Sequence, residues 1–244
     1  MEFVVDLTPF AVLSLIANAV STYGAKELIP LLGVLVLAWV LCAIQMFLID
    51  GALIRFVGGL SPIRFFRGFW PAQVVAFTSQ SSVGTIPVSV KQLVSRLGVN
   101  EDIASFVAAL GANLGMPACA GIWPTLLAVL AINIFDIPYS IGQYAFLIVL
   151  TLIVSIGTVG VPGTSTVTTT ALFTAAGLPV EIIVLLVPIS SVVDMMRTAA
   201  NVTGAATAAV LVAKSEQLLD REVYDQKKSE DGLSGAAAVG ESAR

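Results

Sequence analysis

The chain has 244 residues, of which 57% are hydrophobic and only 11% are charged, with a formal net charge of −4. Soluble domains carry about 25% charged residues, so this composition excludes an ordinary soluble domain and indicates an integral membrane protein. The lack of histidine excludes histidine-ligated metals and histidine general bases, and two cysteines are too few for a disulfide or zinc framework. No basic patch points to nucleic acid. Long apolar segments predict an all-α membrane protein. Without histidine the usual nucleophile–histidine pairing is missing, so we do not expect an enzyme.

The N-terminal part, residues 1–60, predicts transmembrane helices. A short apolar helix is expected at 8–23, and a full spanning helix at 29–57 that ends in Asp50 and Arg55. We expect these helices to lie at the boundary between a scaffold and a transport core.

The transport core is expected over 61–214 and begins with a hairpin at about 65–97. The middle of this hairpin, TSQSSVGTIP at 78–87, is rich in hydroxyls and contains Gly84 and Pro87. Such a run is poor spanning helix, so it predicts two half-helices that meet at a turn. That arrangement is tolerated at membrane depth only where it is buried in protein or lines a cavity.

Three more segments complete the core. A helix at about 101–135 opens with two acids, which are favourable at a helix N-terminus, and is broken by GANLGMPACAG around Pro117. A second hairpin at about 143–178 is cut by SIGTVGVPGTSTVTTT, a last helix covers about 181–214, and residues 215–244 form a polar tail. Paired Gly/Pro-broken apolar segments indicate an inverted-repeat secondary transporter, although both residues are also simply common in transmembrane helices.

The last helix carries the most informative pattern. Asp194, Arg197, Thr198 and Asn201 fall at i, i+3, i+4 and i+7, so they share one helix face. Charged side chains at bilayer depth are costly and by default mark a substrate or ion site. The alternative is a structural Asp–Arg pair that neutralises itself within one turn. That alternative leaves the threonine and the asparagine unexplained, so we predict a ligand site.

Basic residues predict the orientation. One group flanks the first hairpin and consists of Arg55, Arg64, Arg67, Lys91 and Arg96. A second group follows the last helix and consists of Lys214, Arg221, Lys227 and Lys228. The opposite side of the membrane offers only Lys26. The positive-inside rule then predicts a multi-pass protein of the inner membrane with a cytoplasmic C-terminus and an external second hairpin. One hairpin tip would face each side, as alternating access requires.

Four motifs carry a family resemblance: SSVGTIPVS, LGANLGMPACAG, SIGTVGVPG and DMMRTAANVTG. Together they resemble the dicarboxylate/amino acid:cation symporters (glutamate transporter homologues) over residues 8–214, and CAGIWPTLLAV is most similar to the L-cystine uptake branch. The resemblance implies that Asp194 binds a substrate ammonium, Arg197 a distal carboxylate or polar end, and Thr198 and Asn201 the α-carboxylate. The hairpin tips would close over the ligand. The substrate-binding residues implied are Ser81, Ser82, Cys119, Val161, Asp194, Arg197, Thr198 and Asn201.

The resemblance also implies a sodium site of carbonyl oxygens, from Asn113, Ser155, Ile156 and Thr158. Two acids that ligate sodium elsewhere in the family are here Pro117 and Ala205, which disfavours coupling to several sodium ions and favours one sodium ion or a proton. Asp194 is then expected to be the only intramembrane acid left to carry a proton. Cys119 replaces a family threonine, which weakens an aspartate or glutamate assignment; alternatively it is a small buried thiol at a helix crossing.

We therefore expect an elevator-like symporter that moves L-cystine or an acidic amino acid with a gradient of Na⁺ or H⁺, without another cofactor. A C4-dicarboxylate substrate is the alternative within this class, and it would leave Asp194 without an amine to neutralise. A transport-incompetent fragment or partner subunit is the alternative of another class, because the chain begins near the family's fifth helix. With a full-length scaffold, the resemblance implies a homotrimer in the lipid bilayer.

Overall fold

The computed structural model describes residues 28–114, 116–158, 160–161 and 163–225, without the side chains of 28–30, 184, 185, 187 and 188. The regular elements of this part are helices, which confirms the all-α fold class. In chain order they are α3 (Leu28–Ala43), η2 (Ile44–Asp50), η3 (Leu53–Val57), α4 (Pro62–Ser79), α5 (Ser82–Leu97), α6 (Glu101–Gly111), η4 (Pro117–Ile122), α7 (Trp123–Ile134), α8 (Ile141–Ser155), α9 (Thr164–Ala176), α10 (Glu181–Ser215) and α11 (Arg221–Tyr224), where η marks π-helical segments. The helix expected at 8–23, Lys26 and the tail beyond 225 lie outside the described residues.

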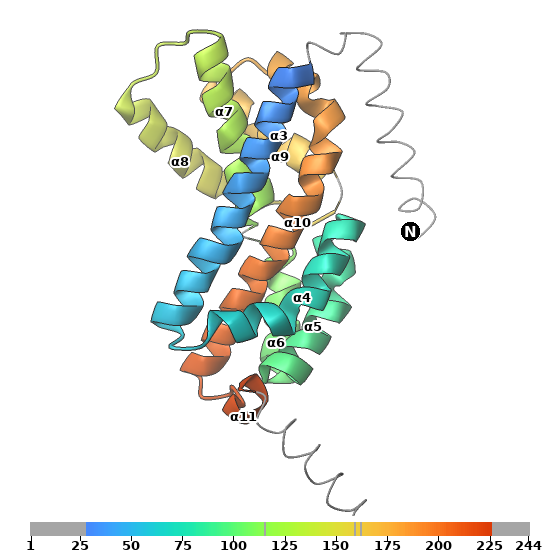
Figure 1. Ribbon diagram of the computed structural model, residues 1–244. Coiled ribbons are helices and arrows are strands. Elements are labelled where there is room, and N and C mark those ends of the chain that lie inside the picture. The colour runs from blue at the N-terminus through green and yellow to red at the C-terminus, as the bar shows by residue number, and fades with distance from the viewer. Residues whose placement is uncertain (1–27, 115, 159, 162, 226–244) are drawn as a thin grey trace, which may run out of the picture.

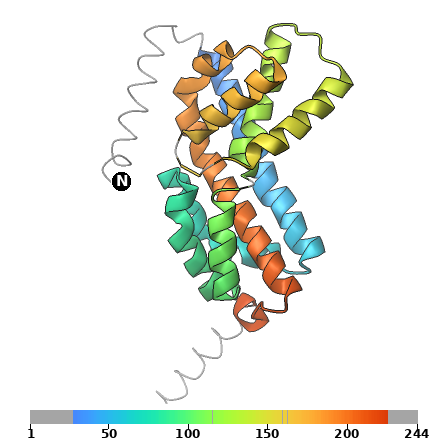
Figure 2. The same cartoon turned by 180° about the vertical axis from the view of Figure 1, so that it is seen from behind.

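Two helical lobes are joined by two long helices (Figures 1 and 2). One lobe contains α4, α5 and α6, the other contains α7, α8 and α9, and the first helix and α10 run along both. Each lobe has its own apolar core, the first around Phe65 and Leu93 and the second around Leu127 and Phe173. The 35 residues of α10 extend over about 50 Å and contribute to both cores. The middle of α10 therefore passes between the two cores.

The first helix begins with α3 and continues through η2 and η3. Its apolar part, Leu31–Val57, has 27 residues and, at about 1.5 Å per residue, is long enough to cross a bilayer. Only 17% of its apolar window is buried, so most of its side chains face outward. The buried stripe recurs every four residues and consists of Ala38, Cys42, Met46, Asp50 and Ile54. Four residues carry a regular α-helix about 40° past a full turn, and the wider π turns keep the stripe on one side.

The first hairpin consists of α4 and α5, which pack together and meet at Gln80 and Ser81. Gln80 has a left-handed backbone with φ 54°, and the Ser81 hydroxyl caps α5 by accepting a hydrogen bond from the Gly84 N–H at 3.0 Å. Because this cap satisfies an amide that the first helical turn leaves free, α5 starts early. Gly84 and Pro87 are thus helical residues of α5, and the turn is shorter than the hydroxyl-rich run 78–87 indicated.

The break in the next helix is short. α6 ends at Gly111, and the chain becomes helical again at Pro117, in the π segment η4 that leads into α7. The expected break within GANLGMPACAG is therefore present, but it lies before Pro117. Pro117 begins a helical segment, a position where its fixed φ and missing N–H are favourable. In the second hairpin, a capping box of Ser140 and Gln143 opens α8, and α9 follows a left-handed Gly163.

The segment after α10 does not leave the fold at residue 215. Leu219 forms an antiparallel bridge with Val99, and the Asp220 N–H donates to the Gly98 carbonyl at 2.7 Å. The Tyr224 hydroxyl donates to the Ser61 carbonyl at 3.0 Å, next to an ion pair between Arg64 and Asp225. Residues 218–225 are thus docked on the base of the first hairpin, whereas a polar tail was expected from 215 onward.

Candidate functional site

Four polar side chains lie buried on one face of α10, where it passes between the two cores. Asp194, Arg197, Thr198 and Asn201 are each 5% exposed or less. Arg197 Nη2 lies 3.1 Å from Asp194 Oδ1, an ion pair between residues three apart on the helix. Removing either partner of a buried pair leaves an uncompensated charge, which typically costs about 3–5 kcal/mol. The pair is therefore an essential part of the local structure, whatever else it binds.

The Arg197 guanidinium is only partly satisfied. Its Nη2 also donates to the Ser190 carbonyl at 3.1 Å, and its carbon lies 4.7 Å from the centre of the Trp123 ring. Nε and Nη1, which carry three N–H donors, have no hydrogen-bond partner, although the side chain is 1% exposed. Buried donors without partners are uncommon and costly, so these atoms mark a place for an acceptor.

Thr198 and Asn201 have structural partners. The Thr198 hydroxyl donates to the Asp194 carbonyl at 2.8 Å. Asn201 Oδ1 accepts from the backbone N–H of Ala118 at 2.8 Å and of Cys119 at 3.4 Å, so it caps the segment after the helix break. Only Asn201 Nδ2 is left without a partner. A structural role thus explains more of this polar face than the sequence pattern indicated. It does not explain Asn201 Nδ2 or the unpartnered guanidinium nitrogens of Arg197.

Cys119 extends the site from α10 into the broken helix. Its Sγ lies 3.6 Å from Asp194 Oδ1, and the side chain is 8% exposed. The thiol therefore contacts the carboxylate for which the resemblance implies an ammonium ligand.

The tips of the two hairpins meet next to this cluster. The Gly160 carbonyl accepts hydrogen bonds from the Val83 N–H at 3.1 Å and from the Ser81 hydroxyl at 3.4 Å. A Cβ at residue 160 would lie 2.4 Å from the Ala112 carbonyl oxygen and 2.7 Å from Ser82 Cβ. Only glycine fits where the two tips and the helix break come together.

A small, partly enclosed cavity lies beneath the tips. Its volume is about 10 Å³, which is room for about one water molecule, and it is lined by Gln80, Ser82, Met116, Cys119, Gly160, Val161, Thr164, Ser165, Asp194 and Thr198. Five of the eight expected substrate residues are in this lining. Ser81 lies next to the cavity, because its hydroxyl donates to the Gly160 carbonyl. Arg197 and Asn201 lie on the same face of α10 as Asp194 but outside the lining.

Sequence reasoning missed several residues of this site. Gln80, whose Oε1 accepts from Ser191 at 3.2 Å, and Ser165, whose buried Oγ has no partner, both line the cavity. Both lie within the hydroxyl-rich runs of the two hairpins, which was the available signal. Trp123 was visible only as part of the run CAGIWP.

The sequence matches the sodium:dicarboxylate symporter family over residues 1–215. The chain belongs to this family. It is 34% identical over 233 residues to an L-cystine uptake protein, TcyP, of Bacillus cereus, covering 95% of this chain and 50% of that protein. It is 35% identical over 222 residues to an uncharacterized symporter of Haemophilus influenzae, covering 91% of this chain and 49% of that protein. The chain thus spans about half the length of the curated relatives it matches. The family consists of transporters and not of enzymes.

In this member of the symporter family, the expected carbonyl site for sodium lies beside the tip contact. Ala112 meets Gly160, so the chain around Asn113 approaches the chain around Thr158. The Thr158 hydroxyl donates to the Val154 carbonyl at 3.1 Å, and the Asn113 Nδ2 donates to the Ala109 carbonyl at 2.9 Å. Ser155 Oγ likewise bonds within its own helix, and the Ile156 side chain is exposed. These four residues can offer their backbone carbonyls, together with Asn113 Oδ1 and the hydroxyl oxygens of Ser155 and Thr158, which act only as donors in these bonds.

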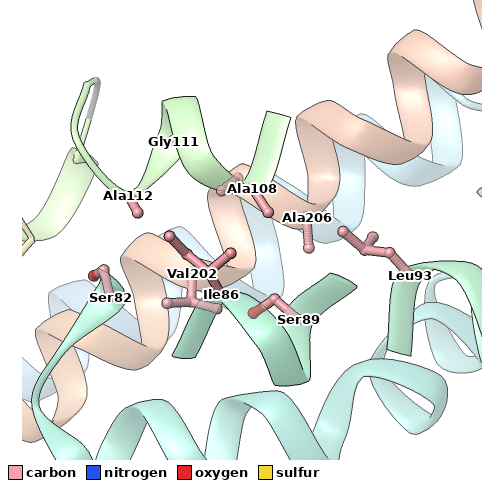
Figure 3. A pocket seen from close by; sticks show the side chains of 10 residues that line it. Ser82, Ile86, Ser89, Leu93, Ala108, Gly111, Ala112, Val202 and Ala206 are labelled. Atoms are coloured by element: carbon pink, nitrogen blue, oxygen red, sulfur yellow. The ribbon is translucent and has the colours of Figure 1, made fainter. Parts of the chain in front are cut away.

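The two positions where the resemblance implies acids are occupied by apolar contacts. A Cβ at Gly204 would lie 3.4 Å from Pro117 Cγ, so Pro117 packs against α10. Ala205 lines a second small cavity between α5, α6 and α10, shown in Figure 3. The hydroxyls of Ser82 and Ser89 are the polar side-chain groups in this otherwise apolar lining. Neither position supplies a charge for a cation.

Proposed function

We propose that this chain is the substrate-binding core of a secondary symporter that moves an amino acid, L-cystine or an acidic amino acid, across the membrane. The observation that carries the proposal is the buried Asp194–Arg197 pair, whose guanidinium has unpartnered donors next to the closed hairpin tips. An amino acid presents an ammonium that can pair with Asp194 and a carboxylate or polar end that can accept from Arg197.

Substrate binding would exchange one ion pair for two. Arg197 would turn its free Nε and Nη1 toward a distal carboxylate or polar end of the substrate, where a guanidinium fork suits a planar acceptor. Asp194 would neutralise the substrate ammonium. Asn201 Nδ2 would donate to the α-carboxylate, and the Thr198 hydroxyl would turn from the Asp194 carbonyl to donate to the same carboxylate. The names of the TcyP relatives favour L-cystine, and Cys119 in place of the family's threonine weakens an aspartate or glutamate assignment.

The small volume of the cavity supports a gated mechanism. A space of about 10 Å³ cannot hold an amino acid, so a hairpin tip has to leave the Gly160 contact before substrate enters. We assign this gate to the second hairpin on the external side, with an elevator-like movement of the core and a cytoplasmic C-terminus. Together with a full-length scaffold the core would form homotrimers in the inner membrane.

The coupling ion is Na⁺ or H⁺ in this proposal. The family's description names sodium, and the backbone carbonyls around Asn113 and Thr158 are suitable oxygen ligands. The apolar Pro117 and Ala205 support fewer sodium ions than in relatives with acids there.

The test is a thermal-shift screen of the purified chain against cystine, aspartate, glutamate and succinate, each in sodium and in potassium. A ligand at about 100 times its Kd stabilises the native state by about 2.7 kcal/mol. We expect a sodium-dependent shift with one amino acid that Arg197→Lys abolishes and that Arg96→Lys, a change on the exposed surface of α5, leaves intact. Lysine keeps the buried charge, so the variant tests the fork and not the ion pair. A shift with succinate alone would favour a C4-dicarboxylate, and a folded chain with no shift would favour a transport-incompetent fragment.

A further inference from the structure

The buried stripe of the first helix contains a second acid. Asp50 lies inside the apolar segment Leu31–Val57 and is 2% exposed. The expectation that Asp194 is the only intramembrane acid is therefore wrong. Asp194 already has a counter-charge in Arg197, whereas none of the ion pairs among the described residues includes Asp50.

Three contacts show how the first helix is aligned with α10. Gln73 Nε2 donates to both Met46 Sδ, at 3.3 Å, and Thr203 Oγ1, at 2.8 Å, which places residues 46 and 203 at one level. Lys214 Nζ donates to the Val57 carbonyl, again with a separation of 157 residues. The same offset places Thr207 at the level of Asp50.

Both of these residues have an oxygen without a partner. Asp50 Oδ2 and Thr207 Oγ1 are buried and form no hydrogen bond, and neither does Oε1 of Gln73, whose Nε2 contacts Met46 and Thr203. Thr207 differs in this from Thr198 and Thr203 on the same helix, whose hydroxyls donate to the carbonyl four residues back. Asp50 Oδ1 has one donor, Gln45 Nε2 at 3.5 Å, one π-helical turn away.

The charged groups on the elements packed against η2 lie elsewhere. On α10, Arg197 pairs with Asp194, Glu181 is at the opposite end of the helix, and Lys214 contacts Val57. Arg55 on η3 is exposed, and α3 carries no charge. On α4, which reaches Gly51 through Phe66, Arg64 pairs with Asp225 and Arg67 is exposed.

An ionised carboxylate buried without a counter-charge costs several kcal/mol, far more than a neutral acid that has hydrogen-bond partners. Protonation would remove this uncompensated charge and would turn Oδ2 from a bare acceptor into a donor. We propose that Asp50 is a proton-binding site of this core: its carboxylate takes up one proton from water and carries it, as a neutral acid, in the closed state.

This inference rests on the proposed function in one respect, because it assigns the proton of a possible H⁺ coupling to Asp50 instead of Asp194. The site itself is independent of substrate. Its test therefore observes the carboxyl group directly and does not depend on transport.

The experiment is infrared difference spectroscopy of the purified chain, titrated between about pH 5 and about pH 8, within the range where folded proteins are usually most stable. The C=O stretch of a protonated carboxylic acid is expected at neutral pH. Asp50→Asn should remove this band, and Asp136→Asn, which changes an exposed carboxyl between α7 and α8, should leave it intact. Gln45→Leu keeps the acid but removes the donor to Asp50 Oδ1, so it should shift the band, and it assigns the band if the asparagine variant does not fold.

A wild-type chain without a protonated carboxyl at neutral pH would overturn the proposal, as would a band that neither the Asp50 nor the Gln45 variant changes. The substrate-induced thermal shift, measured on the same variants, reports separately on the proposed function. If the band disappears in Asp50→Asn but the wild-type chain binds no substrate, the proton site is supported and the proposed substrate-binding function is refuted.

Discussion

The Val83 N–H of the first hairpin donates a 3.1 Å hydrogen bond to the Gly160 carbonyl of the second, 77 residues later in the chain. This bond and the Ser81–Gly160 bond hold the two tips over the Asp194–Arg197 pair. The two tips thus contact each other directly, and in the proposed gated mechanism this contact contributes to the balance between closed and open states.

Gly160→Ala should weaken the closed state. The new methyl would lie 2.4 Å from the Ala112 carbonyl oxygen, and overpacking of this kind typically costs about 1–3 kcal/mol. We expect lower thermal stability and weaker substrate binding in a thermal-shift titration. Gly157→Ala in the same hairpin, where a Cβ meets nothing within 4 Å, is the matched control and should change little. Equal effects of both substitutions would contradict a specific tip contact.

Asn201→Leu should destabilise the helix break. It leaves the buried N–H groups of Ala118 and Cys119 without their acceptor, and an unsatisfied buried donor costs about 1–3 kcal/mol. Denaturation of the purified variant measures the loss. Asn133→Leu, at an exposed position on α7, should leave the free energy of unfolding nearly unchanged. If Asn201→Leu were as stable as wild type, the cap would have no role.

Asp194→Leu alone should be severely destabilising, by about 3–5 kcal/mol, because Arg197 would be left charged and buried. The double variant Asp194→Leu with Arg197→Met removes both charges and should recover much of that stability. It should nevertheless bind no amino acid. Retained binding in the double variant would exclude the pair as the substrate site.

The docked C-terminal segment predicts a loss of stability at alkaline pH. Burial raises the pKa of the Tyr224 hydroxyl above its ordinary value, the Asp225 carboxylate adds to the rise, and Arg64 and Arg221 oppose it. The unfolded chain therefore loses this proton first, so the stabilisation is present below about pH 10 and declines as the pH rises further. Melting curves should show this decline in wild type and in Tyr144→Phe, but less of it in Tyr224→Phe, which also loses the bond to Ser61. An unchanged alkaline decline in Tyr224→Phe would assign it to other groups.

The sequence by itself determined the helices, the two hairpins and the polar face of α10, because these depend on local features. The spacing of Asp194 and Arg197 sets their common face, and the cap residues Ser81, Asn100 and Ser140 set where helices begin. Local patterns did not decide the exact position of the break, because Pro117 can either end a helix or start one, and here it starts η4.

Only the tertiary structure decided which distant residues meet. Four such relationships join segments that lie 48 to 163 residues apart in the chain. They are the contact of Gly160 with Ala112 and Ser82, the capping of the helix break by Asn201, the level shared by Asp50 and Thr207, and the docking of Tyr224. Such contacts depend on the angle and the offset at which helices pack, and helical periodicity specifies a face but not the neighbour that covers it.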